Sequence, residues 1–237
     1  MLKQTIFAAA ALSALSGCDI EPVPVSRPAP GAEPVAVVSR TGSAQSLGDF
    51  RAVVARVEPV AEGVCRQMRP RDNCDFNIVI DSRPGLPPNA YQTYDDAGRP
   101  VIAFTPALIA EMRNRDELSF ALSHEAAHHI EGHISQTQSS AQTGAVLGAV
   151  LGQLAGLDAQ GVDVVTNIGG TVGARRYSKG FELEADSLGA RIAARAGYDP
   201  VRGVLYFQDA ADPGDRFLGT HPPNADRIRT VQQAVGR

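Results

Sequence analysis

The stretch His124-Glu125-Ala126-Ala127-His128 decides the fold and the chemistry that we expect of this chain. Two histidines four residues apart on an α-helix differ by only about 40° around its axis, so both rings point the same way. Each ring can give one nitrogen to a single Zn²⁺, and Glu125 lies where it can take a proton from a metal-bound water. The stretch therefore predicts a helix that carries half of a catalytic zinc site.

A catalytic zinc needs three protein ligands and one open position, so a third ligand must be found. On a continuous helix, His129 and His133 fall about 140° and 180° from His124, which predicts packing or hydrogen-bonding roles for them. Glu131 returns to the ligand side, at about −20°. A third ligand almost in line on one short helix fits tetrahedral geometry poorly, and the better candidates lie later in the chain.

The later candidates are His221 and the carboxylates of a helix predicted over residues 177–196. In this helix Glu182 and Asp186 share one face, whereas Glu184 lies about 200° from Glu182. That face offers Glu182 to the metal, and it offers Asp186 to the Nδ1–H of a liganding histidine, which fixes the tautomer of that ring. A solvated acidic face is the ordinary interpretation of such a pair, but the upstream histidines favour the metal site.

Three motifs in this order resemble those of the M48 family of zinc metallopeptidases. The first is HExxH at 124–128, and the second, at 178–186, is similar to the family's S-R-x-x-E-x-x-A-D segment. Lys179 stands where the family usually has arginine, which affects only a secondary contact. The third motif joins T-H-P at 220–222 to R-I at 227–228, as in periplasmic members of the family. The resemblance covers about residues 47–237.

The resemblance implies one Zn²⁺ per chain, with Glu125 as the general base. It implies that the metal ligands are His124, His128 and Glu182. Asp186 and Arg227 are then residues that contact these ligands but not the metal. It also implies an α+β, mainly helical, zincin-like domain in which a small β-sheet or hairpin packs beside the HExxH helix. By analogy of fold, residues 101–104 would be the edge strand that pairs with an extended peptide.

The implied activity is that of a zinc-dependent endopeptidase of the bacterial periplasm that hydrolyses misfolded or envelope proteins. His221 has two functional interpretations: it donates to the developing oxyanion, or it occupies the open zinc position in the resting enzyme. Packing in a surface loop is the third. The alternative for the whole chain is a chaperone-like or scaffold lipoprotein with a structural or silenced zinc. A structural site, however, takes four protein ligands and has no use for Glu125.

The first 18 residues have the pattern of a bacterial export signal. Lys3 supplies the positive charge, and residues 6–15 form an apolar stretch that is too short to span a membrane. The residues Leu-Ser-Gly-Cys at 15–18 resemble a lipobox, which predicts a signal peptide over 1–17 and a lipid on Cys18. An ordinary signal peptide with an incidental cysteine is the alternative. Asp19 favours the inner over the outer membrane.

Composition separates a tether from a globular domain. Residues 18–46 are rich in Pro, Ala, Val and Ser, which predicts an extended tether before a domain at 47–237. The net charge of −4, without a basic cluster, argues against nucleic acid as a partner. In an oxidising compartment the two remaining cysteines, Cys65 and Cys74, are expected to form a disulfide. Two free buried thiols are the alternative.

Local signals place the other elements. Helical spacing over 50–64 predicts a helix that Pro59 kinks or interrupts. A strand is predicted over 76–80, and a hairpin over 89–93 and 99–105. The expected helix starts are Thr105, Asn114 with Glu117 as its capping-box partner, Asp199, and Asn224, and the expected ends are Gly132 and Gly197.

Glycine recurs at every fourth position between residues 144 and 156, which predicts a helical stripe that lets another backbone approach closely. The apolar run around it has only about 14 residues, too few to cross a bilayer. Close helix packing or a mobile cover is therefore expected rather than membrane contact.

Overall fold

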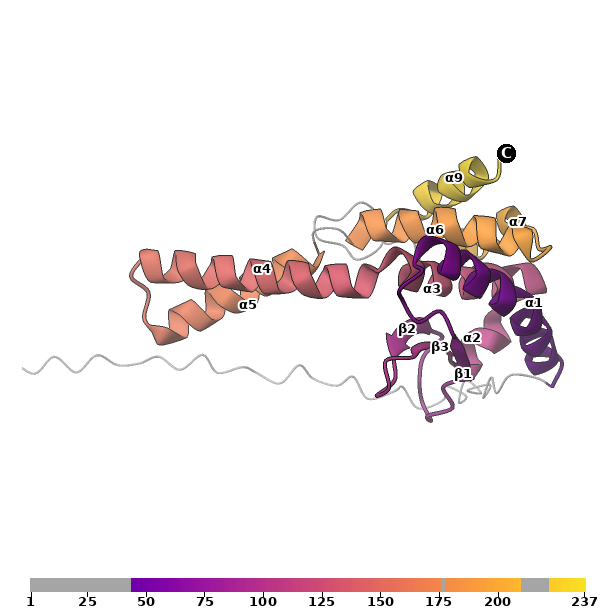
Figure 1. The fold of residues 1–237 in the computed structure, drawn as a ribbon, viewed down its shortest axis with the longest axis horizontal. Helices are drawn as coiled ribbons and strands as arrows, with labels where there is room; N and C mark the ends of the chain where they lie inside the picture. The colour runs from indigo at the N-terminus through magenta and orange to yellow at the C-terminus, as the bar shows by residue number, and fades with distance from the viewer. Residues whose placement is uncertain (1–43, 176–177, 210–221) are drawn as a thin grey trace, which may run out of the picture. The chain divides into compact units, whose positions relative to one another are not determined.

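The computed structural model describes residues 44–175, 178–209 and 222–237, which form nine helices and three strands (Figure 1). The predicted signal peptide, Cys18 and almost all of the predicted tether lie outside the described residues. The elements in chain order are α1 (Ala44–Met68), β1 (Asn77–Ile80), β2 (Ala90–Tyr94), β3 (Pro100–Phe104), α2 (Pro106–Glu111), α3 (Arg115–Glu131), α4 (His133–Leu154), α5 (Ala159–Arg175), α6 (Ser178–Arg195), α7 (Pro200–Val204), α8 (Tyr206–Asp209) and α9 (Asn224–Ala234).

Helix α3 lies at the centre of the arrangement that carries the site. It packs against α1 and α6, the small sheet lies beside it, and α9 covers the other side of α6 (Figure 1). The expected α+β, mainly helical fold with a small sheet beside the HExxH helix is thus confirmed. The core between these elements is aliphatic and aromatic, and its largest fully buried side chains include Phe76, Phe104, Ile102, Ile109, Leu122, Ile130 and Ile192.

Helix α1 continues through Pro59, so of the two expected effects of this residue, a kink or an interruption, the interruption does not occur. Pro59 is exposed, whereas Val53, Val57 and Ala61 are buried against the core. Burial of this apolar face stabilises the helix on both sides of the proline and outweighs the hydrogen bond that the proline removes. The disulfide between Cys65 and Cys74 then joins the last turn of α1 to the segment before β1.

The sheet has the strand order β1-β3-β2. Strands β1 and β3 are parallel, whereas β2 and β3 form the predicted antiparallel hairpin, in which Ala90 faces Phe104 and Tyr94 faces Pro100. The expectation that residues 101–104 form an edge strand is therefore wrong. β3 is hydrogen-bonded on both sides, and β2 is the edge strand next to α3.

Helix α3 begins and ends at the residues that the sequence predicts. The side chain of its N-cap, Asn114, accepts hydrogen bonds from the backbone N–H groups of Asp116 and Glu117. In a capping box, the Glu117 carboxylate would accept a hydrogen bond from the backbone N–H of the N-cap residue. Here it accepts one from the backbone N–H of the preceding residue, Arg113, at 2.8 Å. At the other end, Gly132 has φ +74°, a left-handed conformation that suits glycine and stops the helix.

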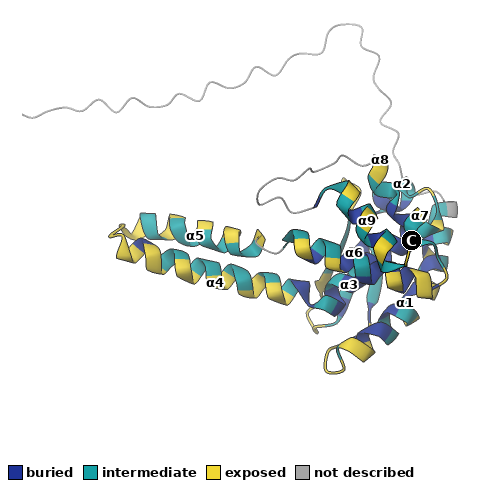
Figure 2. Ribbon diagram, turned by 90° about the horizontal axis from the view of Figure 1, so that it is seen from above, coloured by how far each residue is buried: buried dark blue, intermediate teal, exposed yellow. Residues whose placement is uncertain are grey.

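Helices α4 and α5 form an antiparallel hairpin (Figure 2), and glycines lie where the two backbones approach each other closely. A β-carbon at Gly144 would meet the carbonyl oxygen of Gly169 at 2.1 Å, and one at Gly148 would meet that of Val165 at 2.3 Å. The expected close helix packing is therefore confirmed for these positions. Gly156 lies beyond the end of α4 with φ +72° and is not part of the stripe. No helix in the described part of the chain has the length and apolar character needed to cross a bilayer.

The last helices start close to the predicted residues. As expected, Asp199 caps α7: its side chain accepts hydrogen bonds from the backbone N–H groups of Val201 and Arg202. Pro223 rather than Asn224 is the N-cap of α9. The amide of Asn224 instead donates to the carbonyl oxygen of Phe207 at 2.7 Å, which ties α9 to α8.

Candidate active site

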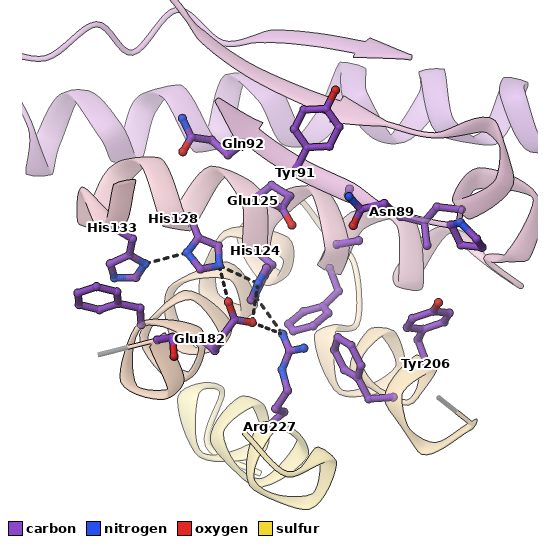
Figure 3. Close-up of a pocket in the computed structure, with 18 of the residues that line it drawn as sticks. Asn89, Tyr91, Gln92, His124, Glu125, His128, His133, Glu182, Tyr206 and Arg227 are labelled. Carbon is purple, nitrogen blue, oxygen red and sulfur yellow. Dashed lines mark hydrogen bonds and ion pairs between the residues drawn. The ribbon is translucent and has the colours of Figure 1, made fainter. Parts of the chain in front are cut away.

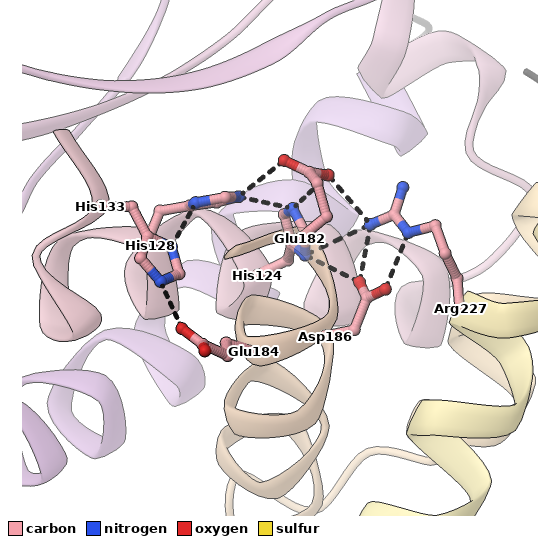
Figure 4. A network of polar contacts seen from close by, with 7 residues as sticks. All are labelled: His124, His128, His133, Glu182, Glu184, Asp186 and Arg227. Carbon is pink, nitrogen blue, oxygen red and sulfur yellow. Dashed lines mark hydrogen bonds and ion pairs between the residues drawn. The ribbon is translucent and has the colours of Figure 1, made fainter. Parts of the chain in front are cut away.

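The donor atoms of His124, His128 and Glu182 converge between α3 and α6 (Figure 4). The Nε2 atoms of the histidines are 3.0 Å apart, and the Glu182 carboxylate oxygens lie 3.3 Å from His128 Nε2 and 3.6 Å from His124 Nε2. With bonds of about 2.0–2.2 Å, a tetrahedral Zn²⁺ places its ligand atoms about 3.3–3.6 Å apart. Both distances to Glu182 fall within this range and the distance between the two histidines is slightly shorter, so the donor set suits zinc.

Asp186 lies one turn after Glu182 and contacts the other nitrogen of His124. Its buried carboxylate is 2.9 Å from His124 Nδ1 and accepts two hydrogen bonds from Arg227, at 2.6 and 2.8 Å. Burial alone would raise the pKa of the Asp186 carboxyl, but the hydrogen bonds from Arg227 and His124 hold it below its ordinary value. A carboxylate at Nδ1 keeps the proton there, which leaves His124 Nε2 free to bind a metal.

Arg227 reaches the site from α9 and is buried. Its guanidinium carbon lies 3.8 Å from the centre of the Phe207 ring, and its Nη2 atom is 3.8 Å from a carboxylate oxygen of Glu182. Burial acts to lower the pKa of Arg227, but Asp186 and Glu182 raise it above its ordinary value, so the charge is retained. One cation therefore orients the two carboxylates of α6 that face α3.

Glu125 and the three candidate ligands line one pocket of about 570 Å³ (Figure 3). Glu125 is next to His124 on α3, so it lies beside the point at which the donor atoms converge. Much of the remaining wall is apolar and is formed by Leu108, Met112, Phe120, Ala121, Tyr206 and Phe207. The pocket thus combines the Glu125 carboxylate, a set of candidate metal ligands and room for an apolar side chain.

The edge strand β2 forms another wall of this pocket through Ala90, Tyr91 and Gln92. Tyr91 turns its ring away from the candidate ligands and donates its hydroxyl hydrogen to Asp81 at 2.8 Å (Figure 3). The backbone of β2 is therefore the part that meets the pocket at this position. The sequence indicated the hairpin but not which of its strands would lie at the edge.

His133 lies in the site, although a continuous helix would place it on the opposite side from His124. Because Gly132 ends α3, His133 starts a new helix and its ring turns back toward His128, with 2.9 Å between the two Nδ1 atoms. Burial and the neighbouring His128 lower the pKa of His133 to about 4, so its ring is neutral at pH 7. The predicted hydrogen-bonding role holds, but the predicted position is wrong.

The other histidine and acid considered on α3 lie away from the ligand cluster. His129 is buried on the sheet side of the helix, where its Nε2 lies 3.0 Å from the carbonyl oxygen of Asn73 and its ring packs against Phe76 and Tyr94. Glu131 is not part of the group that could hold a metal. His221 lies outside the described residues.

The fold and the site together define a class of protein. A helix with HExxH offers two nitrogen donors to a metal, a following helix offers a glutamate, and a small sheet borders the pocket, as in a zincin-like metallopeptidase. Residues 50–235 match the model of peptidase family M48, and the chain belongs to this family. Membership implies a zinc metallopeptidase. A comparison with curated proteins gave no match.

Proposed function

We propose that this protein is a zinc-dependent endopeptidase that cleaves unfolded or misfolded polypeptides at the periplasmic face of a bacterial membrane. The observation that carries the proposal is the convergence of His124, His128 and Glu182, with donor atoms 3.0–3.6 Å apart, in the same pocket as Glu125. The three donor side chains would bind the zinc ion, and the neighbouring Glu125 carboxylate would act as the base for hydrolysis.

The residues of the chain have distinct tasks in this reaction. A zinc ion bound by the three ligands would supply a Lewis acid for the water and for the scissile carbonyl. Glu125 takes a proton from the attacking water and delivers it to the leaving amine. Asp186 and Arg227 contact His124 and Glu182 and orient them toward the metal position.

The edge strand β2 supports an extended polypeptide as the substrate. Its outer backbone groups are not used by the sheet, because β3 pairs with its other side. An extended segment can add to such an edge through main-chain hydrogen bonds, and its side chains then point alternately toward and away from the pocket. Folded proteins rarely expose a strand in this way, which favours unfolded substrates.

The cellular location is proposed from the sequence and from one covalent bond. The Leu-Ser-Gly-Cys stretch ending at Cys18 predicts a lipid anchor, and Asp19 favours the inner membrane. The bond between Cys65 and Cys74 is typical of an oxidising compartment. Replacement of Cys18 by Ser should release an active protein into the soluble fraction of the periplasm. Retention of this variant in washed membranes would contradict lipid anchoring at Cys18.

The decisive experiment compares wild type with Glu125→Gln. Both proteins should bind one zinc per chain, as measured by atomic absorption after dialysis. Only the wild type should cleave unfolded casein, because the variant keeps the ligands and loses the proton acceptor. Comparable cleavage by the zinc-loaded variant would overturn the role of Glu125. A folded, zinc-loaded wild type that cleaves no unfolded protein would favour a chaperone-like role instead.

A further inference from the structure

The candidate ligand His128 has a partner on the side that faces away from the metal. Its Nδ1 atom lies 2.9 Å from Nδ1 of His133, and Nε2 of His133 lies 3.1 Å from a carboxylate oxygen of Glu184 (Figure 4). The three side chains form a chain of polar contacts from the metal site to the surface of α6. Glu184 is exposed at its outer end, and His133 is buried in the middle.

The ring of His133 is fixed by packing as well as by these contacts. It stacks on Phe181, with 4.3 Å between the ring centres and 13° between the ring planes. Phe181 directly precedes Glu182 on α6, so the same turn supplies a metal ligand and the surface beneath His133. The left-handed conformation of Gly132 ends α3 and allows His133 to take up this position.

The contacts specify where the protons are. A histidine that gives its Nε2 lone pair to a metal carries its proton on Nδ1. In His128 this N–H points at Nδ1 of His133, which must then be unprotonated to accept it. His133 therefore carries its own proton on Nε2, where the Glu184 carboxylate accepts it. A single arrangement of protons satisfies all three groups.

We propose that His133, supported by Glu184, is a positioning residue that sets the tautomer and ring orientation of His128 for metal binding. The inference rests on the proposed zinc site and deepens it. The two histidine ligands then have different partners. His124 contacts the buried carboxylate of Asp186 directly, whereas His128 contacts the imidazole of His133, which in turn contacts an exposed carboxylate. Loss of such a support commonly weakens metal binding about 10- to 100-fold.

The test measures zinc dissociation constants by chelator competition on the full chain. His133→Phe keeps an aromatic ring for the stack on Phe181 and removes the acceptor, so zinc should bind about 10- to 100-fold more weakly. His133→Asn retains an oxygen close to the position of Nδ1 and should recover most of that loss. The matched control is His129→Phe, which replaces a buried histidine on the other side of α3 and should leave zinc affinity unchanged.

Glu184→Ala keeps the proposal testable if His133→Phe does not fold, because the Glu184 side chain is 59% exposed. This variant should weaken zinc binding by about 3- to 10-fold, less than a change at a directly contacting residue. In ¹⁵N spectra of the zinc-loaded wild type, His133 should be protonated at Nε2 and His128 at Nδ1. Wild-type zinc affinity in both His133→Phe and Glu184→Ala would overturn the proposal.

Binding and cleavage are separate readouts in this experiment. A wild-type protein that binds zinc but cleaves nothing contradicts the proposed peptidase function, and the affinities of the variants still decide the role of His133. A wild-type protein that takes up no zinc overturns both proposals.

Discussion

Gly189 of α6 lies directly against the backbone of His124 in α3. A β-carbon at position 189 would meet the amide nitrogen of His124 at 2.9 Å and its Cα atom at 3.0 Å. Backbone atoms cannot turn aside as a side-chain end can, so only glycine lets the two helices approach this closely. The same approach brings Glu182 and Asp186 of α6 within reach of the histidine.

We therefore expect Gly189→Ala to weaken zinc binding and to lower the free energy of unfolding of the metal-free protein by about 1–3 kcal/mol. The added methyl group pushes α6 away from α3 and carries the carboxylates with it. Chelator competition and urea unfolding measure the two effects. Gly180→Ala is the matched control on the same helix, because a β-carbon there meets no atom within 4 Å. Equal zinc affinity in the two variants would contradict this role of Gly189.

Much of this arrangement could be predicted from the sequence because its signals are local. Asn114 and Gly132 mark the ends of α3 through capping and a left-handed turn, and the spacing of His124 and His128 follows from the helical period. Glu182 could be placed toward the metal by the same periodicity. These predictions depend on residues within a few positions of one another, which is the range over which sequence patterns act.

The contacts that could not be predicted depend on residues far apart in the chain. The pairing of β3 with β1, which leaves β2 at the edge, joins segments more than 20 residues apart. His133 seemed remote from the ligands because the helical angle was extended past Gly132, although the glycine itself marked the end of the helix. Helical periodicity placed Glu184 away from the candidate metal ligands, which is where it lies, but gave no indication of its link to His128 through His133.

The disulfide between Cys65 and Cys74 should stabilise the domain without affecting catalysis. The bond closes a step of nine residues between α1 and β1, and a loop of this length is expected to contribute about 2–3 kcal/mol. Replacement of both cysteines by alanine should lower the free energy of urea unfolding by that amount, with unchanged zinc affinity. Reductant should destabilise the wild type to a similar extent and have no effect on the double variant.

The glycine contacts between α4 and α5 should determine the local stability of this helical hairpin rather than that of the core. Gly148→Ala places a methyl group 2.3 Å from the carbonyl oxygen of Val165, so the two helices must separate locally. We expect faster hydrogen exchange across α4 and α5, with little change in α3 and α6. Gly170→Ala is the control, since its β-carbon meets its nearest atom at an ordinary 3.5 Å. Uniformly faster exchange across the whole domain would show that the hairpin and core unfold together.

The apolar pocket should determine which side chain is accepted next to the scissile bond. Ala121 lies on α3 one turn before His124 and lines this pocket with Phe120 and Met112. Leucine at position 121 would occupy space that a substrate side chain needs, while the metal ligands and Glu125 stay in place. The variant should therefore keep its zinc affinity.

We expect the wild type to prefer Leu or Phe at that substrate position and Ala121→Leu to lose kcat/KM for these peptides by about 10-fold or more. Peptides with Ala or Gly there should lose less, because they leave most of the pocket empty in either protein. Mass spectrometry of a digested peptide library measures both preferences at once. A uniform loss across all peptides would indicate damage to catalysis instead, and an unchanged preference would show that the substrate side chain binds elsewhere.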